Sequence, residues 1–323
     1  MYPFSMVLAN RRQFLTSGLA VGTGLVAGCL GGDDDARDLS IHTAGEGASH
    51  YTKSAPLVEL LPEHTEDPPL SATVSTSDGS VANIRNLDNG EIDIGTTVDQ
   101  IGHLAYNGEV PFEDEIDIRC IMRSEVVAQY YVVRDDSEIE TISDLDGVTM
   151  TSGPEGSGTH GQHDTLMDHY GLETDDQYMG YGEGLRALRD GDLDAFFGHH
   201  GSDTMNAFAT DGDELRVLGW TEDEFDSMQE VFPWTARAEV TPDMLENYEE
   251  TELAMGTNSF WVTMPEMDDD VVYEMTRAIL ENPEPIQESN VNSENLETEW
   301  AYYDFGVPYH DGSLEYFEEH GLI

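Results

Sequence analysis

The chain has 323 residues, of which 67 are acidic and 13 are basic, so its formal net charge at pH 7 is −54. Hydrophobic residues make up 38% of the chain, which is enough to build the cores of two ordinary domains and excludes a disordered chain. The acids are spread along the whole length, as expected for a halophilic protein kept soluble in concentrated salt, and this charge excludes a nucleic-acid partner.

Residues 1–28 are predicted to be an export signal. Arg11-Arg12-Gln13-Phe14-Leu15 is a twin-arginine motif, and an apolar, glycine-rich run follows it. The run ends in Leu25-Val26-Ala27-Gly28-Cys29, which has the pattern of a lipobox. We therefore expect cleavage before Cys29, lipidation of Cys29, a flexible linker over 29–37, and anchoring at the outer face of the cell membrane. A short membrane anchor with an incidental cysteine is the alternative.

The stretch from Ser75 to Thr97 predicts a turn of small hydroxyl residues, a helix that begins near Ser80, and a strand carrying Ile92 and Ile94. Free backbone N–H groups and the positive end of the helix dipole make such a turn attractive to small anions. Residues 89–95 are echoed by residues 190–196, and a second glycine–serine helix start over 154–159 precedes the echo. We therefore expect two similar α/β lobes, each presenting a helix N-terminus to a shared cleft.

Two strongly β-forming runs, 129–134 and 259–263, each end in a polar turn and are predicted to link the lobes. The predicted lobe 1 comprises 38–132 and 262–323, and lobe 2 comprises 133–261. Other strands are expected over 39–43, 70–74, 148–151 and 215–218, and other helices over 55–61, 100–106, 159–170 and 271–279. Cys120 lies in an apolar alternation and is expected to be a buried, inert thiol.

With these motifs in this order, the chain resembles the solute-binding subunits of tripartite ATP-independent periplasmic (TRAP) transporters, of the TAXI type. The resemblance covers residues 39 to about 282. The motifs that carry it are Thr43 to Tyr51, Asp78-Gly79-Ser80-Val81-Ala82-Asn83, Asn107-Gly108-Glu109-Val110-Pro111-Phe112, Gly153 to Thr159, Asp192-Leu193-Asp194-Ala195-Phe196-Phe197 and Asp270-Val271-Val272-Tyr273.

The resemblance implies an α/β fold of the two-lobed type II periplasmic binding protein, with two hinge strands linking the lobes. It also implies a non-enzymatic, cofactor-free receptor that takes a small carboxylate such as glutamate or 2-oxoglutarate and delivers it to a TRAP membrane permease. Two departures leave the particular carboxylate open. Glu46 and His50 interrupt the opening glycine loop, and Glu239-Val240-Thr241-Pro242-Asp243 replaces a small-residue segment of the family.

The candidate ligand contacts combine the resemblance with the two predicted helix starts. Ser80 and Asn83 lie one turn apart at one helix start, although Ser80 could serve only as the helix cap. Ser157, Gly158 and Thr159 are the counterpart in lobe 2, where a plain turn is the alternative. The full predicted set is His50, Tyr51, Ser77, Ser80, Asn83, Thr97, Gln100, Ser157, Gly158, Thr159, His200 and Trp234.

A metal site is not expected. His160 and His163 are three residues apart, and His199 and His200 are adjacent, but neither pair supplies the three or four converging ligands that zinc needs. A serine hydrolase is not expected either, because Gly156-Ser157-Gly158 lacks the spacing of a nucleophile elbow. The protein is expected to be a monomer. Two alternatives to the TRAP receptor stay open: a binding protein that serves an ATP-driven importer, and a metal-dependent enzyme.

Overall fold

A computed structural model describes residues 36–45, 48–153, 155, 158–200, 215–242, 244, 251–289 and 296–323. The predicted signal peptide, Cys29, Glu46 and Ser157 lie outside these residues. None of the helices within the described ranges combines the length and the apolar character that a bilayer span requires.

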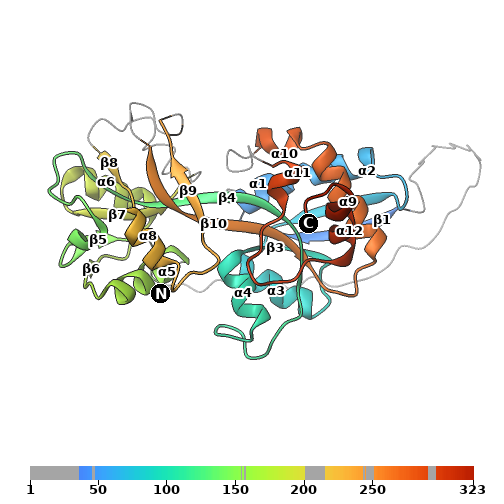
Figure 1. Cartoon of the computed structure of the whole chain (residues 1–323), viewed down its shortest axis with the longest axis horizontal. Coiled ribbons are helices and arrows are strands. Elements are labelled where there is room, and N and C mark those ends of the chain that lie inside the picture. The colour runs from blue at the N-terminus through green and yellow to red at the C-terminus, as the bar shows by residue number, and fades with distance from the viewer. Residues whose placement is uncertain are drawn as a thin grey trace, which may run out of the picture. The chain divides into compact units, whose positions relative to one another are not determined.

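A mixed sheet of ten strands runs through the described part of the chain (Figure 1). The strands follow the order β2-β1-β3-β10-β4-β7-β5-β6, with β8 beside β4 and β9 beside β10. Their bounds are β1 (Arg37–His42), β2 (Leu70–Ser75), β3 (Ile94–Val98), β4 (Arg119–Arg134), β5 (Thr149–Thr151), β6 (Asp175–Asp176), β7 (Ala195–His199), β8 (Leu215–Leu218), β9 (Ala236–Val240) and β10 (Glu252–Thr263).

The long antiparallel strands β4 and β10 link two lobes (Figure 1). In lobe 1, β1 pairs in parallel with β2 and β3; in lobe 2, β5 pairs in parallel with β6 and β7. The helices of lobe 1 are α1 (Ser49–Ser54), α2 (Leu57–His64), α3 (Ser80–Asp88), α4 (Asp99–Tyr106), α9 (Asp269–Glu281), α10 (Glu284–Ser289), α11 (Thr298–Ala301) and α12 (Asp311–Glu319). Those of lobe 2 are the short 3-10 helix η1 (Ile142–Leu145), α5 (Gly158–Tyr170), α6 (Tyr181–Asp190) and α8 (Glu222–Met228).

Each lobe has its own hydrophobic core. The core of lobe 1 draws on residues 39–122 and 260–317. Lobe 2 has two clusters, and Tyr131 and Val133 of β4 enter one while Tyr130 and Val132 enter the other. Because successive strand residues point to opposite faces, the two clusters cover the two faces of the sheet. The predicted boundaries at 132/133 and 261/262 stay predictions.

The echo in the sequence corresponds to the same structural junction in each lobe. Gly90 and Gly191 both end a helix with a positive φ, +68° and +81°, and a strand begins four residues later in each case. Just before that strand, Asp93 exchanges hydrogen bonds with Ser40 of β1. Asp194 does the same with Thr149 of β5. The repeated acidic residue therefore joins each incoming strand to the first strand of its lobe.

Two sequence expectations about the strands have clear outcomes. The predicted strand carrying Ile92 and Ile94 begins only at Ile94, because the bonds of Asp93 to Ser40 place Ile92 in the preceding turn, although it is buried. Cys120 is buried in β4, as expected, and burial raises the pKa of its thiol well above the ordinary value.

A bulge in β4 matters for the site. Ser259 of β10 pairs with Glu125 and Phe260 pairs with Arg123, so Ser124 is an extra residue in β4. A bulge of this kind breaks the strict alternation of side chains along a strand. As a result Glu125 contacts α1, whereas Arg123 contacts the main chain of α11.

Candidate functional site

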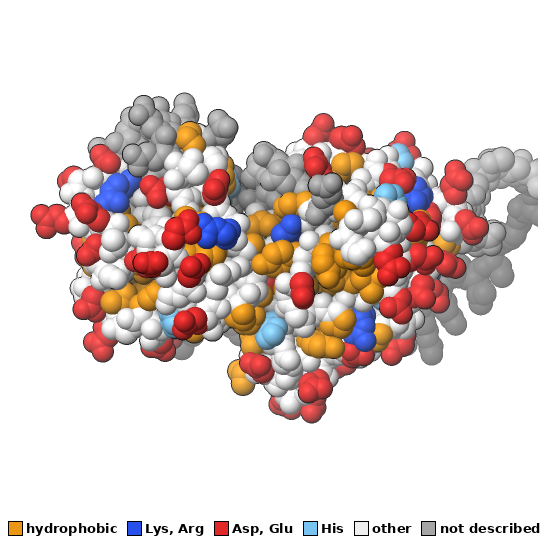
Figure 2. Space-filling model, in the orientation of Figure 1, with side chains coloured by type: hydrophobic (Ala, Val, Ile, Leu, Met, Phe, Trp, Pro, Cys, Tyr) orange, Lys and Arg blue, Asp and Glu red, His pale blue; other side chains and the backbone are white. Residues whose placement is uncertain are grey.

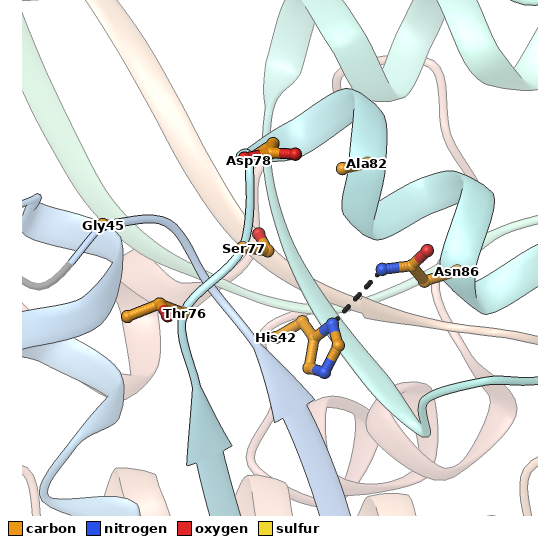
Figure 3. Close-up of a pocket in the computed structure, with 7 residues that line it drawn as sticks. All are labelled: His42, Gly45, Thr76, Ser77, Asp78, Ala82 and Asn86. Carbon is orange, nitrogen blue, oxygen red and sulfur yellow. Dashed lines mark hydrogen bonds between the residues drawn. The ribbon is translucent and has the colours of Figure 1, made fainter. Parts of the chain in front are cut away.

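An open cavity of about 720 Å³ lies on lobe 1 at the carboxyl ends of β1 and β2 (Figure 3). Ligands of open α/β sheets bind characteristically outside the carboxyl ends of the strands. The cavity is lined by His42, Gly45, Thr76, Ser77, Asp78, Ala82 and Asn86. We call it the lobe-1 pocket, and Ser77 is the member of the predicted contact set that lines it.

The start of α3 forms one wall of this pocket. Gly79 is the N-cap, with φ +94° and ψ −163°, a conformation open essentially to glycine alone. Its N–H donates to the Ser77 hydroxyl over 3.0 Å. Ser80 is therefore the first helical residue and not the cap, which removes the alternative that it serves only as the cap. The N–H groups of the first turn have no acceptor in a preceding turn, because the helix begins there.

Asn83 is fully buried and bonded to protein on both sides of its amide. Its Nδ2 donates to the carbonyl oxygens of Thr43 (2.7 Å) and Thr96 (2.9 Å), and its Oδ1 accepts from the Ser77 hydroxyl at 2.6 Å. These bonds tie the loops after β1 and β2 to β3. Asn83 thus braces the pocket from behind, and its predicted role as a ligand contact remains a prediction.

A histidine–amide pair forms another part of the pocket lining. Asn86 Nδ2 donates to His42 Nδ1 over 3.3 Å, as the dashed line in Figure 3 marks. In this arrangement the proton of a neutral His42 sits on Nε2, which is then a donor. The described lining thus offers hydroxyl, imidazole and amide groups together with one carboxylate, from Asp78, and no lysine or arginine.

A second polar group, which we call the linker cluster, joins α1 to the two linking strands. Lys53 Nζ lies 2.8 Å from Glu125 Oε1, and both side chains are 0% exposed. The Ser49 hydroxyl donates to the same oxygen over 3.0 Å. His50 Nε2 contacts Ser259 Oγ at 3.0 Å and lies 3.8 Å from Glu125 Oε1.

The charges of the linker cluster are fixed by burial and pairing. Burial alone would raise the pKa of Glu125, but the charges of Lys53 and His50 and the hydrogen bonds from Lys53 and Ser259 lower it to about 2. Burial, followed by the charge of Lys53, lowers the pKa of His50 to about 3. At neutral pH the cluster is therefore an ion pair beside a neutral imidazole.

One chain of hydrogen bonds connects the lobe-1 pocket to the linker cluster. It runs from Ser77 to Asn83 (2.6 Å), from Asn83 to Thr96 Oγ1 (3.3 Å), and from Thr96 to His50 Nδ1 (3.0 Å). The other ring nitrogen of His50 continues it to Ser259 of β10. Both nitrogens of His50 are thus engaged with protein, and its place in the predicted contact set stays a prediction.

The predicted contacts of lobe 2 lie around the start of α5 and the end of β7. Gly158 is the first residue of α5, and the buried Thr159 donates to the Ser152 carbonyl and contacts the Tyr181 hydroxyl, each at 2.7 Å. His200 is buried with Nδ1 3.4 Å from the Tyr130 hydroxyl. Burial, followed by the charge of His199, lowers the pKa of His200 to about 4.

The end of β7 lies next to β4 near the linker cluster, because His199 pairs with Gln129. The charge of His199 contributes to the lowered pKa of His50. Burial lowers the pKa of His199 itself, while its hydrogen bond with His200 and the charge of Glu125 act to raise it. His199 pairs with Gln129 of β4, and its charge and that of Glu125 therefore act on neighbouring groups of the linker cluster.

Trp234 also connects the two lobes, through contacts that are separate from the linker cluster. Its ring lies 4.6 Å from the His103 ring of α4, and its carbonyl accepts from the Tyr303 hydroxyl at 3.1 Å and from Asn258 Nδ2 at 3.4 Å. The tryptophan packs against the core of lobe 1 and against one core of lobe 2. Trp234 therefore connects the two lobes, and its place in the predicted contact set stays a prediction.

The other predicted contacts are more dispersed. Thr97 is buried in β3 and donates to the Val98 carbonyl, Gln100 is the second residue of α4, and Tyr51 is half-buried in α1. Next to Gln100, the buried Asp99 accepts hydrogen bonds from Asn258 N (2.7 Å) and Nδ2 (2.9 Å). Burial raises the pKa of Asp99 to about 7, against these hydrogen bonds, which lower it.

The histidines of α5 are held by neighbouring protein groups. His163 contacts the Tyr131 hydroxyl at 3.0 Å and the Thr174 hydroxyl at 3.1 Å. His160 contacts the Ser152 hydroxyl at 3.2 Å. Within the described residues, no three His, Cys, Asp or Glu side chains converge as metal ligands.

Sequence reasoning missed Lys53, Glu125, His42, Asn86 and Asp78 as site residues. Two signals could have found the first two: Lys53 is the only lysine in the chain, and Glu125 lies in a mostly apolar, β-forming run over 118–133. A buried charge in such a run requires a partner. His42 and Asn86 carried no comparable signal, because only the fold brings the end of β1 beside the outer turns of α3.

Solved structures share the fold of this chain. The chain is similar to SsuA, a periplasmic sulfonate-binding protein of Methylobacillus flagellatus, at 16% identity, covering 89% of this chain and 88% of that one with a TM-score of 0.51. It is also similar to a TctC solute-binding protein from Polaromonas, at 12% identity, covering 88% of this chain and 98% of that one with a TM-score of 0.54. A third similar structure is XAC2383 of Xanthomonas citri, solved with chloride bound. The identity is 12%, and the match covers 87% of this chain and 95% of that one with a TM-score of 0.51. At these identities the likeness shows the fold and not the ligand.

The fold class is therefore the predicted one, a two-lobed type II periplasmic binding protein whose lobes are joined by β4 and β10. The chain belongs to the NMT1-like family, whose family model matches residues 41–321.

Proposed function

We propose that this protein is an extracytoplasmic solute-binding receptor of the TAXI type, which captures a small organic anion of the glutamate or 2-oxoglutarate kind and delivers it to a TRAP membrane permease. The observation that carries the proposal is the lobe-1 pocket, which lies at the carboxyl ends of β1 and β2 and beside the first turn of α3. Main-chain N–H groups at a helix start hold carboxylates without a cationic side chain.

Binding and closure need no covalent step and no cofactor. The ligand binds first to lobe 1, and the helix start at Gly158 and Thr159 completes the site from lobe 2. Contacts made only in the closed state shift the population towards closure, with β4 and β10 as the connection that bends. The hydrogen bonds that lead from Ser77 through Asn83 and Thr96 to His50, and from His50 to Ser259 of β10, support the idea that lobe movement and pocket are coupled.

Ligand screening by thermal shift and calorimetry in molar KCl tests the function. A ligand present at about 100 times its Kd stabilises the folded protein by about 2.7 kcal/mol. We expect a small dicarboxylate to raise the melting temperature and Ser77→Ala to weaken its binding. Ser71→Ala is the matched control, because the Ser71 hydroxyl donates to the exposed Asp38 carboxylate and Ser71 does not line the pocket. Stabilisation by sulfonates or cations and by no carboxylate would reject the proposed substrate class.

Export by the twin-arginine route and anchoring through lipidated Cys29 belong to the same proposal. The motif over 11–15 and the small residues before Cys29 support it. Cys29→Ser is expected to move the protein from the membrane fraction to the medium while ligand binding is retained. Retention of the variant in the membrane fraction would contradict the lipid anchor.

A receptor for an ATP-driven importer is the second candidate, favoured by the likeness to a sulfonate-binding protein. The two candidates share a fold and differ in the membrane partner. Uptake of labelled ligand into vesicles that contain the partner permease separates them, since a TRAP permease works without ATP. Strict ATP dependence would favour the importer.

A further inference from the structure

The segment between α8 and β9 connects lobe 2 to lobe 1 without using either linking strand (Figure 1). Phe232 is buried in a core cluster of lobe 2, and two residues later the Trp234 carbonyl accepts a hydrogen bond from the Tyr303 hydroxyl at 3.1 Å. The centroid of the Trp234 ring lies 4.6 Å from that of His103 in α4. Tyr303 and His103 belong to lobe 1 and lie outside β4 and β10. We call these two interactions the Trp234 contact.

The lobe-2 side of the Trp234 contact is fixed by a turn. Thr235 N donates to the Phe232 carbonyl at 3.0 Å, which closes a turn around Trp234. The carbonyl of the buried Thr235 accepts a hydrogen bond from Gln229 Nε2 at 3.3 Å. The Trp234 carbonyl therefore moves together with lobe 2.

The lobe-1 side of the contact is held by Arg123, which is only 8% exposed. Its guanidinium carbon lies 4.0 Å from the centre of the Trp300 ring and 4.9 Å from the centre of the Tyr303 ring. Its Nε donates to the Trp300 carbonyl at 2.9 Å, and its Nη1 donates to Asn258 Oδ1 at 3.2 Å. Asn258 Nδ2 is the second, longer donor to the Trp234 carbonyl, at 3.4 Å. One arginine of β4 thus positions both donors.

The Trp234 contact can open without leaving a polar group buried and unpaired. Trp234 and Tyr303 are both half-buried, so water can replace each partner when the two separate. Exchanging one neutral hydrogen bond for bonds to water shifts an equilibrium by about two- to tenfold. The Lys53–Glu125 pair differs, because both side chains are 0% exposed and separation would leave two buried charges unpaired. The Trp234 contact is therefore the part of the lobe junction that is suited to reversible opening.

We propose that the Trp234 contact is a latch. It holds lobe 2 against α4 and the segment after α11, and it opens when the lobes move apart about β4 and β10. The hydrogen bond and the ring contact are both lost on separation, so the latch favours the arrangement in which the lobes meet. Weakening it shifts the population towards separated lobes. The inference concerns lobe movement and depends on no particular solute.

Distances between spin labels on the two lobes, measured by double electron–electron resonance in molar KCl, test the latch. Asp88→Cys at the end of α3 and Asp226→Cys in α8 place the labels at exposed positions of lobe 1 and lobe 2. Cys29→Ser in the same chain leaves Cys120 as the only native thiol, and Cys120 is buried.

Tyr303→Phe removes the hydroxyl that donates to Trp234 and keeps the ring that packs on Arg123. We expect it to raise the ratio of separated to joined lobes by about two- to tenfold, seen as a longer and broader distance distribution. Tyr302→Phe is the matched control, because it loses the same atom from the adjacent residue, whose ring packs on Tyr309 within lobe 1. The control is expected to keep the distribution of the labelled parent protein.

A second variant tests whether the two parts of the contact act together. Trp234→Ala removes the ring that packs on His103 and frees the turn that presents the carbonyl. In the Trp234→Ala protein, Tyr303→Phe is therefore expected to add little further separation. Circular dichroism and the melting temperature show whether each variant is folded, and if Trp234→Ala does not fold, the two tyrosine variants decide alone.

Three results would overturn the latch. They are unchanged or shorter distances in Tyr303→Phe, an equal lengthening in Tyr302→Phe, and a full additional effect of Tyr303→Phe in folded Trp234→Ala. None of these results bears on the solute, and failure of every carboxylate to bind would reject the proposed substrate class while leaving the latch standing.

Discussion

Lys53 illustrates what a single residue can contribute in a chain with so few cations. It is the only lysine, and it is fully buried beside Glu125, a residue 72 positions later in the sequence. Desolvating two charges is costly, and their attraction offsets that cost only when the geometry is good. The Ser49 hydroxyl donates to the shared carboxylate oxygen and supplies part of that geometry.

Removing one partner of the Lys53–Glu125 pair is expected to destabilise the folded protein strongly. Lys53→Met leaves the Glu125 carboxylate buried without a counter-charge, so the free energy of unfolding should fall by about 3–5 kcal/mol. The double variant Lys53→Met with Glu125→Leu should recover most of that loss, because no unpaired charge remains. Denaturant unfolding in molar KCl measures the free energy of unfolding of the single and the double variant. A single variant within about 1 kcal/mol of wild type would contradict the pairing argument.

His50 is expected to give the protein a specific acid sensitivity. Its pKa is lowered from 6.5 to about 3 in the folded state, so the unfolded chain binds its proton first as the pH falls. The stability that depends on neutral His50 is present above the unfolded pKa of 6.5 and declines between there and about pH 3, at up to about 1.4 kcal/mol per pH unit.

Replacing His50 by glutamine tests this, because the amide keeps a donor and an acceptor but does not titrate. We expect the pH dependence of the unfolding free energy over the same interval to be shallower in His50→Gln than in wild type. The buried His200 acts in the same direction and should keep part of the slope. An identical pH dependence of the unfolding free energy in the two proteins would exclude His50 as a source of that dependence.

At the scale of elements, the start of α3 depends on one glycine. Gly79 has φ +94°, and a Cβ built there would meet no atom within 4 Å. The cost of Gly79→Ala is therefore backbone strain alone, about 1–3 kcal/mol, and the altered turn should also weaken ligand binding. Thermal unfolding and calorimetry measure the two effects.

Gly161 provides the opposite case in the same experiment. It lies inside α5, its backbone is not in the left-handed region, and it too has open space around the Cβ position. Gly161→Ala is expected to raise stability by about 0.5–1 kcal/mol through helix propensity. Destabilisation by Gly161→Ala as well would contradict the argument from backbone conformation, because both positions have open space around the Cβ.

The helices and strands were largely predictable, because the residues that end each one are its own neighbours in the sequence. Asn89-Gly90 and Asp190-Gly191 end α3 and α6 as expected, and the β-forming runs at 129–134 and 259–263 belong to the two linking strands. Contacts between distant segments were not predictable. No local pattern pairs Lys53 with Glu125 or brings Asn86 to His42, and the bulge at Ser124 that turns Glu125 towards α1 is visible only once β10 is in register.

For the whole molecule, the excess of acids is a surface property. Figure 2 shows Asp and Glu side chains over much of the visible face, with few Lys or Arg side chains among them. The linker cluster, by contrast, is buried and balanced by Lys53. Salt screens exposed charges within roughly 3 Å at molar ionic strength but reaches buried pairs far less. Surface repulsion and the buried pair should therefore respond to salt in different ways.

This difference yields a prediction for the intact protein. Raising KCl from about 0.2 M to about 3 M should increase the melting temperature by roughly 10 °C, because it removes self-repulsion among charges that total −54. An uncharged osmolyte at matched water activity is the control, since it stabilises by exclusion but does not screen. The melting-temperature loss caused by Lys53→Met should be about the same at both salt concentrations, because the pair is shielded from solvent. If high salt rescued that variant, the lysine–glutamate pair would have to be accessible to ions, and the closed packing of α1 against β4 and β10 would be wrong.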